Sequence, residues 1–102
     1  MPHPPKKVRV GPHIYRIRLV PDGILEGAGS DGTCQPRHLT IGLDANQPAT
    51  AMADTLLHEL THALLATVKL DDDVEEAVAL ALAPGLLALL RDNPPLVAYL
   101  TD

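Results

Sequence analysis

The segment from Ala49 to Val68 constrains the fold most, because it contains neither Gly nor Pro. Its apolar residues recur with the period of a helix and form one stripe: Leu56, Leu57, Leu60, Ala63 and Leu64. Upstream, Asn46 is suited to a helix N-cap and Pro48 to a first turn. The sequence therefore predicts an uninterrupted helix from Pro48 to Val68.

This predicted helix carries the pattern H-E-x-x-H at His58-Glu59-Leu60-Thr61-His62. Residues four apart lie on one helix face, so both imidazoles can bind one metal ion. Zinc hydrolases use this arrangement, with the Glu as general base toward water. The competing interpretation is a buried helix whose two rings are hydrogen bonded in the core, although burying them unpartnered costs on the order of several kcal/mol. We expect one Zn²⁺ per chain, with His58 and His62 as ligands and Glu59 as the catalytic residue.

A catalytic zinc takes a third protein ligand and keeps its fourth position for water. Candidate carboxylates lie in the acidic run Asp71-Asp72-Asp73-Val74-Glu75-Glu76, where a second helix is predicted to begin. If that helix returns antiparallel, its first two turns come level with His62, because each residue advances the axis by about 1.5 Å. Glu75 and Glu76 are therefore the leading candidates, followed by the three aspartates.

The same acidic run is also suited to capping the second helix. Asp72 with Glu75, and Asp73 with Glu76, have the spacing of a capping box. If Asp72 caps the helix, Glu76 can face the first helix together with a stripe of small and apolar residues, namely Ala79, Leu80 and Ala83. This stripe favours Glu76 as the ligand and leaves Glu75 as a cap or surface charge.

The motif followed by a Glu at the start of a second helix resembles a minimal gluzincin metallopeptidase. From Val8 to Pro95 the chain is similar to small zinc-peptidase-like proteins of phages and prophages and, more distantly, to ImmA/IrrE-type peptidases. The resemblance implies zinc-dependent hydrolysis of peptide bonds, with Glu76 completing the zinc ligands and Glu59 as general base. The sequence departs from the pattern at Ala83-Pro84-Gly85, where two helix breakers interrupt the second helix.

Two clear strands precede the helices. Residues His13 to Val20 alternate with period two, and His38 to Leu43 form a second apolar run. Val8 to Val10 is a short strand or a lead-in, Ile24 to Glu26 can pair back as a hairpin, and Gly27 to Pro36 has the composition of a loop.

A sheet followed by helices predicts an α+β fold, with a small N-terminal antiparallel sheet, the active-site helix and an antiparallel second helix. The second helix is expected over Asp72 to Arg91, kinked or split at Pro84, and the apolar tail Leu96 to Leu100 is expected to fold back onto the core. We expect one domain over residues 8–102 after a disordered, Pro-rich tail over residues 1–7.

Composition excludes several classes of protein. A formal net charge of -5 argues against a general nucleic-acid binder, and the N-terminal basic residues alternate with apolar ones, as on the solvated face of strands. The longest apolar run, Ala77 to Leu90, is too short to span a membrane. Cys34 is the only cysteine and residues 1–7 show no signal-peptide pattern, so a cytoplasmic protein is expected, in the host cytoplasm if phage-encoded.

The expected partner is a peptide or protein substrate. By analogy with zincins, an extended peptide is expected to pair with the strand over residues 38–43. Side chains available to stabilise the oxyanion are Tyr99, Tyr15, His13 and His38, and Asp54 could orient the His58 ring from one turn earlier. The alternative function is a non-catalytic, zinc-stabilised module that binds a host or phage protein.

Overall fold

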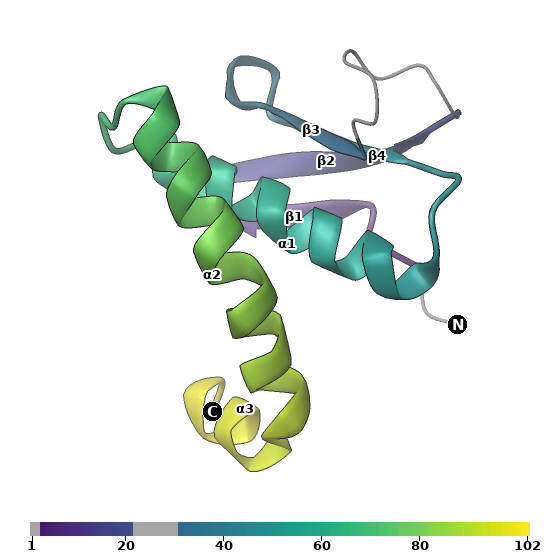
Figure 1. Ribbon diagram of the computed structural model, residues 1–102, viewed down its shortest axis with the longest axis vertical. Helices are drawn as coiled ribbons and strands as arrows, with labels where there is room; N and C mark the ends of the chain where they lie inside the picture. The colour runs from purple at the N-terminus through teal and green to yellow at the C-terminus, as the bar shows by residue number, and fades with distance from the viewer. Residues whose placement is uncertain (1–2, 22–30) are drawn as a thin grey trace.

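The computed structural model describes residues 3–21 and 31–102 and shows a four-stranded sheet followed by helices (Figure 1). The strands are β1 (Lys7–Val10), β2 (His13–Val20), β3 (Gly32–Gln35) and β4 (Thr40–Asp44), with a 3₁₀ turn η1 (Pro36–His38) between the last two. The helices are α1 (Ala49–Leu65), α2 (Asp72–Asp92) and α3 (Pro94–Leu100). The predicted α+β class is confirmed.

The strand order is β1-β2-β4-β3, and the sheet is mixed. β1 with β2 and β3 with β4 are antiparallel, but β2 and β4 are parallel, with Ile17 opposite Ile41. β3 comes before β4 in the chain but lies at the edge of the sheet. The chain then turns at Leu39, whose φ is 54°, and β4 pairs between β2 and β3. The prediction of an all-antiparallel sheet is wrong for this pair, because alternation along a strand does not determine the direction of its neighbour.

β3 is a strand that the sequence did not predict. It lies within Gly27 to Pro36, which was expected to be a loop, and it has only four residues. Among the described strands it pairs with β4 alone, and such an edge strand needs little of the apolar alternation that identifies a strand. The expected hairpin over Ile24 to Glu26 lies outside the described residues.

Strand pairing begins slightly earlier than predicted. β1 starts at Lys7, and the Lys6 carbonyl accepts a hydrogen bond from the Ile17 N–H at 2.9 Å. Ordered structure therefore begins within the stretch that was expected to be a disordered tail. Arg9, Arg16 and Arg18 are exposed, which fits the predicted solvated strand face.

The core lies between the sheet and α1. Tyr15 and Ile17 of β2 and Ile41 and Leu43 of β4 are buried, and they pack with Ala63 of α1. Partly buried apolar residues complete this cluster: Val8, Val10, Cys34, Leu39, Met52, Leu56 and Leu60. The periodic stripe along α1 thus attaches the helix to the sheet, and this fixes the height and rotation of His58 and His62.

The helix ends differ from the sequence expectation. α1 begins one residue after Pro48, whose carbonyl accepts the Met52 N–H at 2.8 Å, while the Asn46 N–H donates to the Asp44 carboxylate at 2.8 Å. Asn46 is therefore not the N-cap. α2 runs without interruption through Pro84, so of the two expected alternatives, a kink or a split, the split does not occur.

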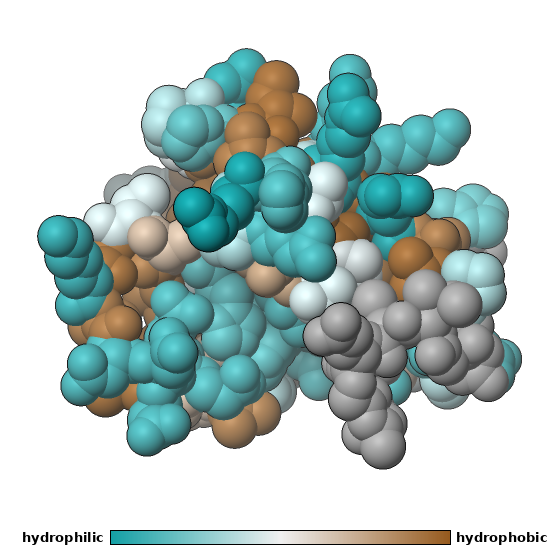
Figure 2. All heavy atoms as spheres, turned by 90° about the horizontal axis from the view of Figure 1, so that it is seen from above, coloured by the Kyte–Doolittle hydropathy of each residue, from teal (hydrophilic) through white to brown (hydrophobic). Residues whose placement is uncertain are grey.

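α2 turns back across α1 near its start and then leaves the sheet (Figure 1). α3 packs on the end of α2, away from the sheet, with Tyr99 80% and Leu100 61% exposed. The expectation that Leu96 to Leu100 folds back onto the core is wrong, because α2 carries this segment away from it. The surface at the opposite end of the molecule is mostly hydrophilic, with separate apolar patches (Figure 2). Among the described residues, no helix is both long and apolar enough to cross a bilayer.

Candidate metal centre

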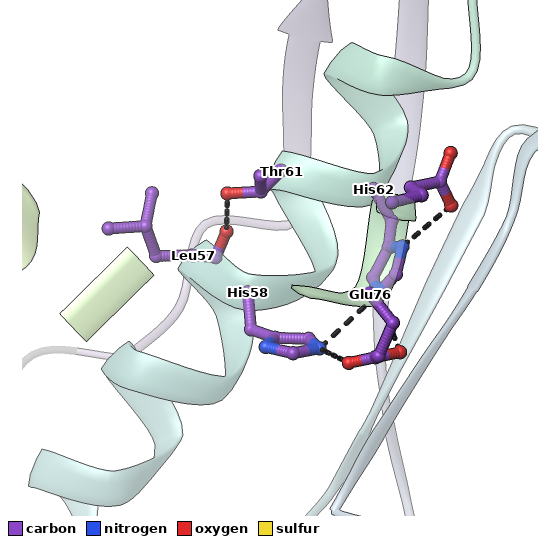
Figure 3. A network of polar contacts seen from close by, with 6 residues as sticks. Leu57, His58, Thr61, His62 and Glu76 are labelled. Atoms are coloured by element: carbon purple, nitrogen blue, oxygen red, sulfur yellow. Dashed lines mark hydrogen bonds and ion pairs between the residues drawn. The ribbon is translucent and has the colours of Figure 1, made fainter. Parts of the chain in front are cut away.

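His58, His62 and Glu76 converge on one point between α1 and α2 (Figure 3). The Nε2 atoms of the two histidines are 3.3 Å apart. Glu76 places Oε1 2.9 Å from the His58 Nε2 and Oε2 3.2 Å from the His62 Nε2. The three residues predicted as ligands therefore form a group that could hold a metal ion.

The spacing of these atoms fits zinc. Zinc binds imidazole nitrogen and carboxylate oxygen at about 2.0–2.2 Å, so the ligand atoms of a tetrahedral site lie about 3.3 Å from one another. The two Nε2 atoms are 3.3 Å apart, and Glu76 places one carboxylate oxygen 2.9 Å from the His58 Nε2 and its other oxygen 3.2 Å from the His62 Nε2. Glu76 is half exposed, and the group opens into a cleft of about 550 Å³. Two imidazole nitrogens and a carboxylate thus form a group that could hold a metal ion, and its open side leaves room for a further ligand.

Glu75 contacts the second ring nitrogen of His62, Nδ1. Its Oε2 lies 2.8 Å from the His62 Nδ1, and its side chain is 24% exposed. If Nδ1–H donates to this carboxylate, the lone pair of Nε2 points toward the metal position. Glu75 is thus paired with His62, whereas the sequence analysis expected a cap or surface charge.

The predicted capping boxes are absent. α2 begins at Asp72 with Asp71 as its N-cap, and Asp71 makes no side-chain cap hydrogen bond. Neighbouring residues on a helix differ by about 100°. Glu75 and Glu76 therefore approach His62 from two sides, one at each ring nitrogen.

Glu59 is only 7% exposed. Burial raises the pKa of its carboxyl group; the positive charges of His58 and His62 act against this rise, and Glu76 adds to it. The net result is a raised pKa. A carboxylate with a raised pKa is a better proton acceptor, which suits the predicted general base.

Gly32 of β3 lies directly against this carboxylate. A Cβ atom at Gly32 would be 2.6 Å from the Thr55 Cγ2 and 3.2 Å from the Glu59 Oε2. Only glycine permits so close an approach of β3 to α1. Gly32 is a site residue that the sequence analysis missed, because it lies in a segment whose composition indicated a loop.

The pKa of His62 is raised above its ordinary value. Burial by itself lowers it, but the hydrogen bond to Glu75 and the negative charges of Glu59, Glu76 and Glu75 outweigh that effect. The histidine therefore tends to hold a proton when the site contains no metal. Metal binding must displace that proton.

The cleft is negatively charged. Its lining combines β3, α1 and the start of α2, and includes five carboxylates: Asp31, Asp54, Glu59, Glu75 and Glu76. No Lys or Arg is among the described residues that line it. Even with a divalent metal bound, the cleft favours a ligand that carries positive charge.

The residues predicted to orient His58 or to stabilise the oxyanion do not occupy the expected positions. Asp54 lines the cleft, but its buried Oδ1 has no hydrogen-bond partner, so this oxygen does not orient His58. Tyr15 is 3% exposed within the core, and Tyr99 is on α3. None of the four candidates for stabilising the oxyanion, His13 and His38 included, is among the described lining residues.

The sheet edge beside the cleft is β3. β4 is paired on both sides, by β2 and by β3, so it has no free edge for a peptide. The expected docking along residues 38–43 is therefore wrong, and residues 32–34 of β3 line the cleft instead. A strand's place in the sheet depends on long-range pairing, which its own residues do not encode.

Cys34 lines the cleft but stands outside the metal-ligand group. Burial, followed by the negative charges of Glu59 and Glu75, raises the pKa of its thiol to about 12. The thiol is therefore protonated at neutral pH and acts as a small apolar residue.

Comparison with known proteins finds no matching family model, no similar curated protein and no similar solved structure. Function is therefore inferred from the geometry of the site.

Proposed function

We propose that the protein is a zinc-dependent metallopeptidase. The observation that carries this proposal is the convergence of two imidazole nitrogens and the two oxygens of the Glu76 carboxylate at 2.9–3.3 Å beside the buried Glu59. A zinc ion at this position would supply Lewis acidity toward a peptide carbonyl and lower the pKa of water to about 7.

In this proposal the chain's own residues hold and move the proton. Glu59 accepts a proton from the attacking water and then donates it to the leaving amine. Its buried position, with a raised pKa, supports both steps. Glu75 holds the His62 ring with Nε2 toward the metal position, so the ligand does not reorient during turnover.

The substrate proposed is a peptide lying along the edge of β3. An edge strand offers main-chain hydrogen bonds to an extended chain, and Thr33 adds a hydroxyl group to the same wall of the cleft. The five carboxylates in the lining favour peptides with Lys, Arg or a free amino group near the scissile bond.

The test compares the parent with Glu59→Gln, using full-length protein loaded with zinc. Elemental analysis should show one zinc per chain in both proteins. Cleavage of a fluorogenic peptide series with graded charge should fall by about 10²–10⁴-fold in Glu59→Gln, as is typical for loss of a general base. Asp73→Asn, an exposed carboxylate outside the cleft lining, is the matched control and should retain activity.

The second candidate function is a zinc-stabilised, non-catalytic binding module. It is favoured by the absence of all four predicted oxyanion donors from the described cleft lining. A parent protein that binds zinc but cleaves no peptide in the series would contradict the peptidase proposal and support this module.

A further inference from the structure

The second half of α2 has two apolar faces, and only one of them is covered. No charged residue occurs between Glu76 and Arg91. Ala79 and Ala83 are buried on one face. The other face is exposed along its length, and its members are Ala81, Leu82, Gly85, Ala88 and Leu89. We call these five residues the exposed stripe. A helix that is apolar on all sides is normally covered on all sides.

The exposed stripe combines two large residues with three small ones. Leu82 and Leu89 are 48% and 49% exposed, and Ala81, Gly85 and Ala88 lie between and beside them. A Cβ atom at Gly85 would meet nothing within 4 Å. The fold of one chain therefore does not require glycine there, and glycine weakens a helix interior. A small residue at this point instead permits another backbone to approach closely.

The exposed stripe can pack against the same stripe of a second copy that runs in the opposite direction. In an antiparallel pair with a two-fold axis at Gly85, residues at equal distance from Gly85 face each other. Leu82 then faces Ala88, and Ala81 faces Leu89, so every leucine meets an alanine. An interface between identical chains requires this self-complementarity, whereas an interface with an unrelated partner does not.

We propose that two copies of this chain form a dimer in which their α2 helices pack antiparallel through the exposed stripe, with the two-fold axis at Gly85. The absence of charge between residues 77 and 90 means that no like-charge repulsion arises at this contact, despite the net charge of -5 per chain. Because a stable interface covers about 800 Å² per partner, we expect α3, with its exposed Tyr99 and Leu100, to contribute to it.

The dimer leaves the metal centre free. Glu76 lies nine residues before Gly85, and nine helical steps of about 100° place it on the face of α2 opposite Gly85. Association should therefore occur with or without zinc, and it is independent of the proposed peptidase activity.

The primary test is the molar mass of the full chain across the micromolar range, measured by light scattering after gel filtration and by sedimentation equilibrium. The parent should be dimeric. Leu89→Glu and Gly85→Leu should weaken association by at least about tenfold, as expected for central interface positions. The matched control is Leu64→Glu on α1, 59% exposed and outside the exposed stripe, which should leave the dimer intact.

Folding of each variant is checked by circular dichroism and zinc content, and the open space at Gly85 means that the monomer should accept Leu there. A monomeric parent would overturn the proposal, whether or not another protein covers the exposed stripe. A dimer that survives both α2 substitutions would place the interface elsewhere.

The axis is tested by crosslinking. In a Cys34→Ser background, Gly85→Cys should form an intermolecular disulfide under mild oxidation, because the same residue of each copy meets at a two-fold axis. Thr67→Cys, exposed near the end of α1, should not form one. An uncrosslinked Gly85→Cys dimer would exclude an axis at this residue.

Discussion

The two halves of α2 show how one helix can serve two different purposes. In the first half, Glu75 and Glu76 are held by histidines of α1, and polar groups that would be costly to bury find partners. In the second half, Leu82 and Leu89 are 48% and 49% exposed, and no charged residue lies between residues 77 and 90. The polar groups of the first half are paired within the chain's own fold, whereas the exposed leucines of the second half would be covered by the same helix of another copy in the dimer that we propose.

The largest effect is expected when the candidate metal ligand Glu76 is removed from the first half of α2. Glu76→Ala should lower zinc affinity by more than the roughly 10–100-fold that loss of an outer partner costs, because it removes a direct ligand. Zinc affinity is measured by competition with a chromogenic chelator. The variant's melting temperature should no longer respond to chelator, whereas the parent's should fall, since bound metal stabilises the folded state. Unchanged affinity would exclude Glu76 as a ligand.

Glu75→Ala should have the next largest effect. Without the carboxylate at 2.8 Å, the His62 ring loses the partner of Nδ1, and zinc affinity should fall by about 10–100-fold. Asp73→Ala, at an exposed position outside the cleft lining, is the control and should leave affinity unchanged. A loss of stability in Glu75→Ala without loss of zinc affinity would return this residue to the role of a cap.

Replacing Gly32 and Gly85 by alanine should change the stability of the protein in opposite directions. Gly32→Ala places a Cβ atom against Thr55 and Glu59, so it should destabilise the protein by about 1–3 kcal/mol and impair activity. Gly85→Ala meets no atom of its own chain and should stabilise α2 by up to about 1 kcal/mol. Denaturant unfolding at low protein concentration measures both. Equal effects of the two substitutions would contradict the close approach of β3 to α1.

The smallest expected effect is a dependence of stability on pH that reverses with metal. Raised pKa values of His62 and Glu59 mean that the folded, metal-free protein favours their protonated forms. Their stabilising contributions are present below the ordinary values of 6.5 and 4.5 and are lost as pH rises through the raised ones. Zinc needs the deprotonated ligands.

The gap in melting temperature between zinc-loaded and metal-free protein should therefore widen as pH rises from about 5 to 8. A gap that stays constant over this range would show that His62 does not exchange a proton for the metal. Differential scanning calorimetry at fixed ionic strength measures both melting temperatures.

Local patterns were sufficient for the elements in which one segment determines its own geometry. The spacing of His58 and His62 places both rings on one helix face, and the alternation of β2 was enough to predict a strand. Of the predicted stripe of Ala79, Leu80 and Ala83, the two alanines are buried and Leu80 is 62% exposed. The alanines were sufficient to select the face of α2 that turns inward, which is why Glu76 was predicted correctly as part of the group.

Glu59, His58, His62 and the helix that carries them thus follow from the sequence by itself, because helix periodicity relates residues only a few positions apart. Tertiary structure alone decided that β3 is the edge strand, that Gly32 contacts Glu59, and that Glu75 binds the second nitrogen of His62. It also decided that α3 lies away from the core. These features depend on distances between segments far apart in the chain, and such distances are set by packing and strand pairing rather than by any local repeat.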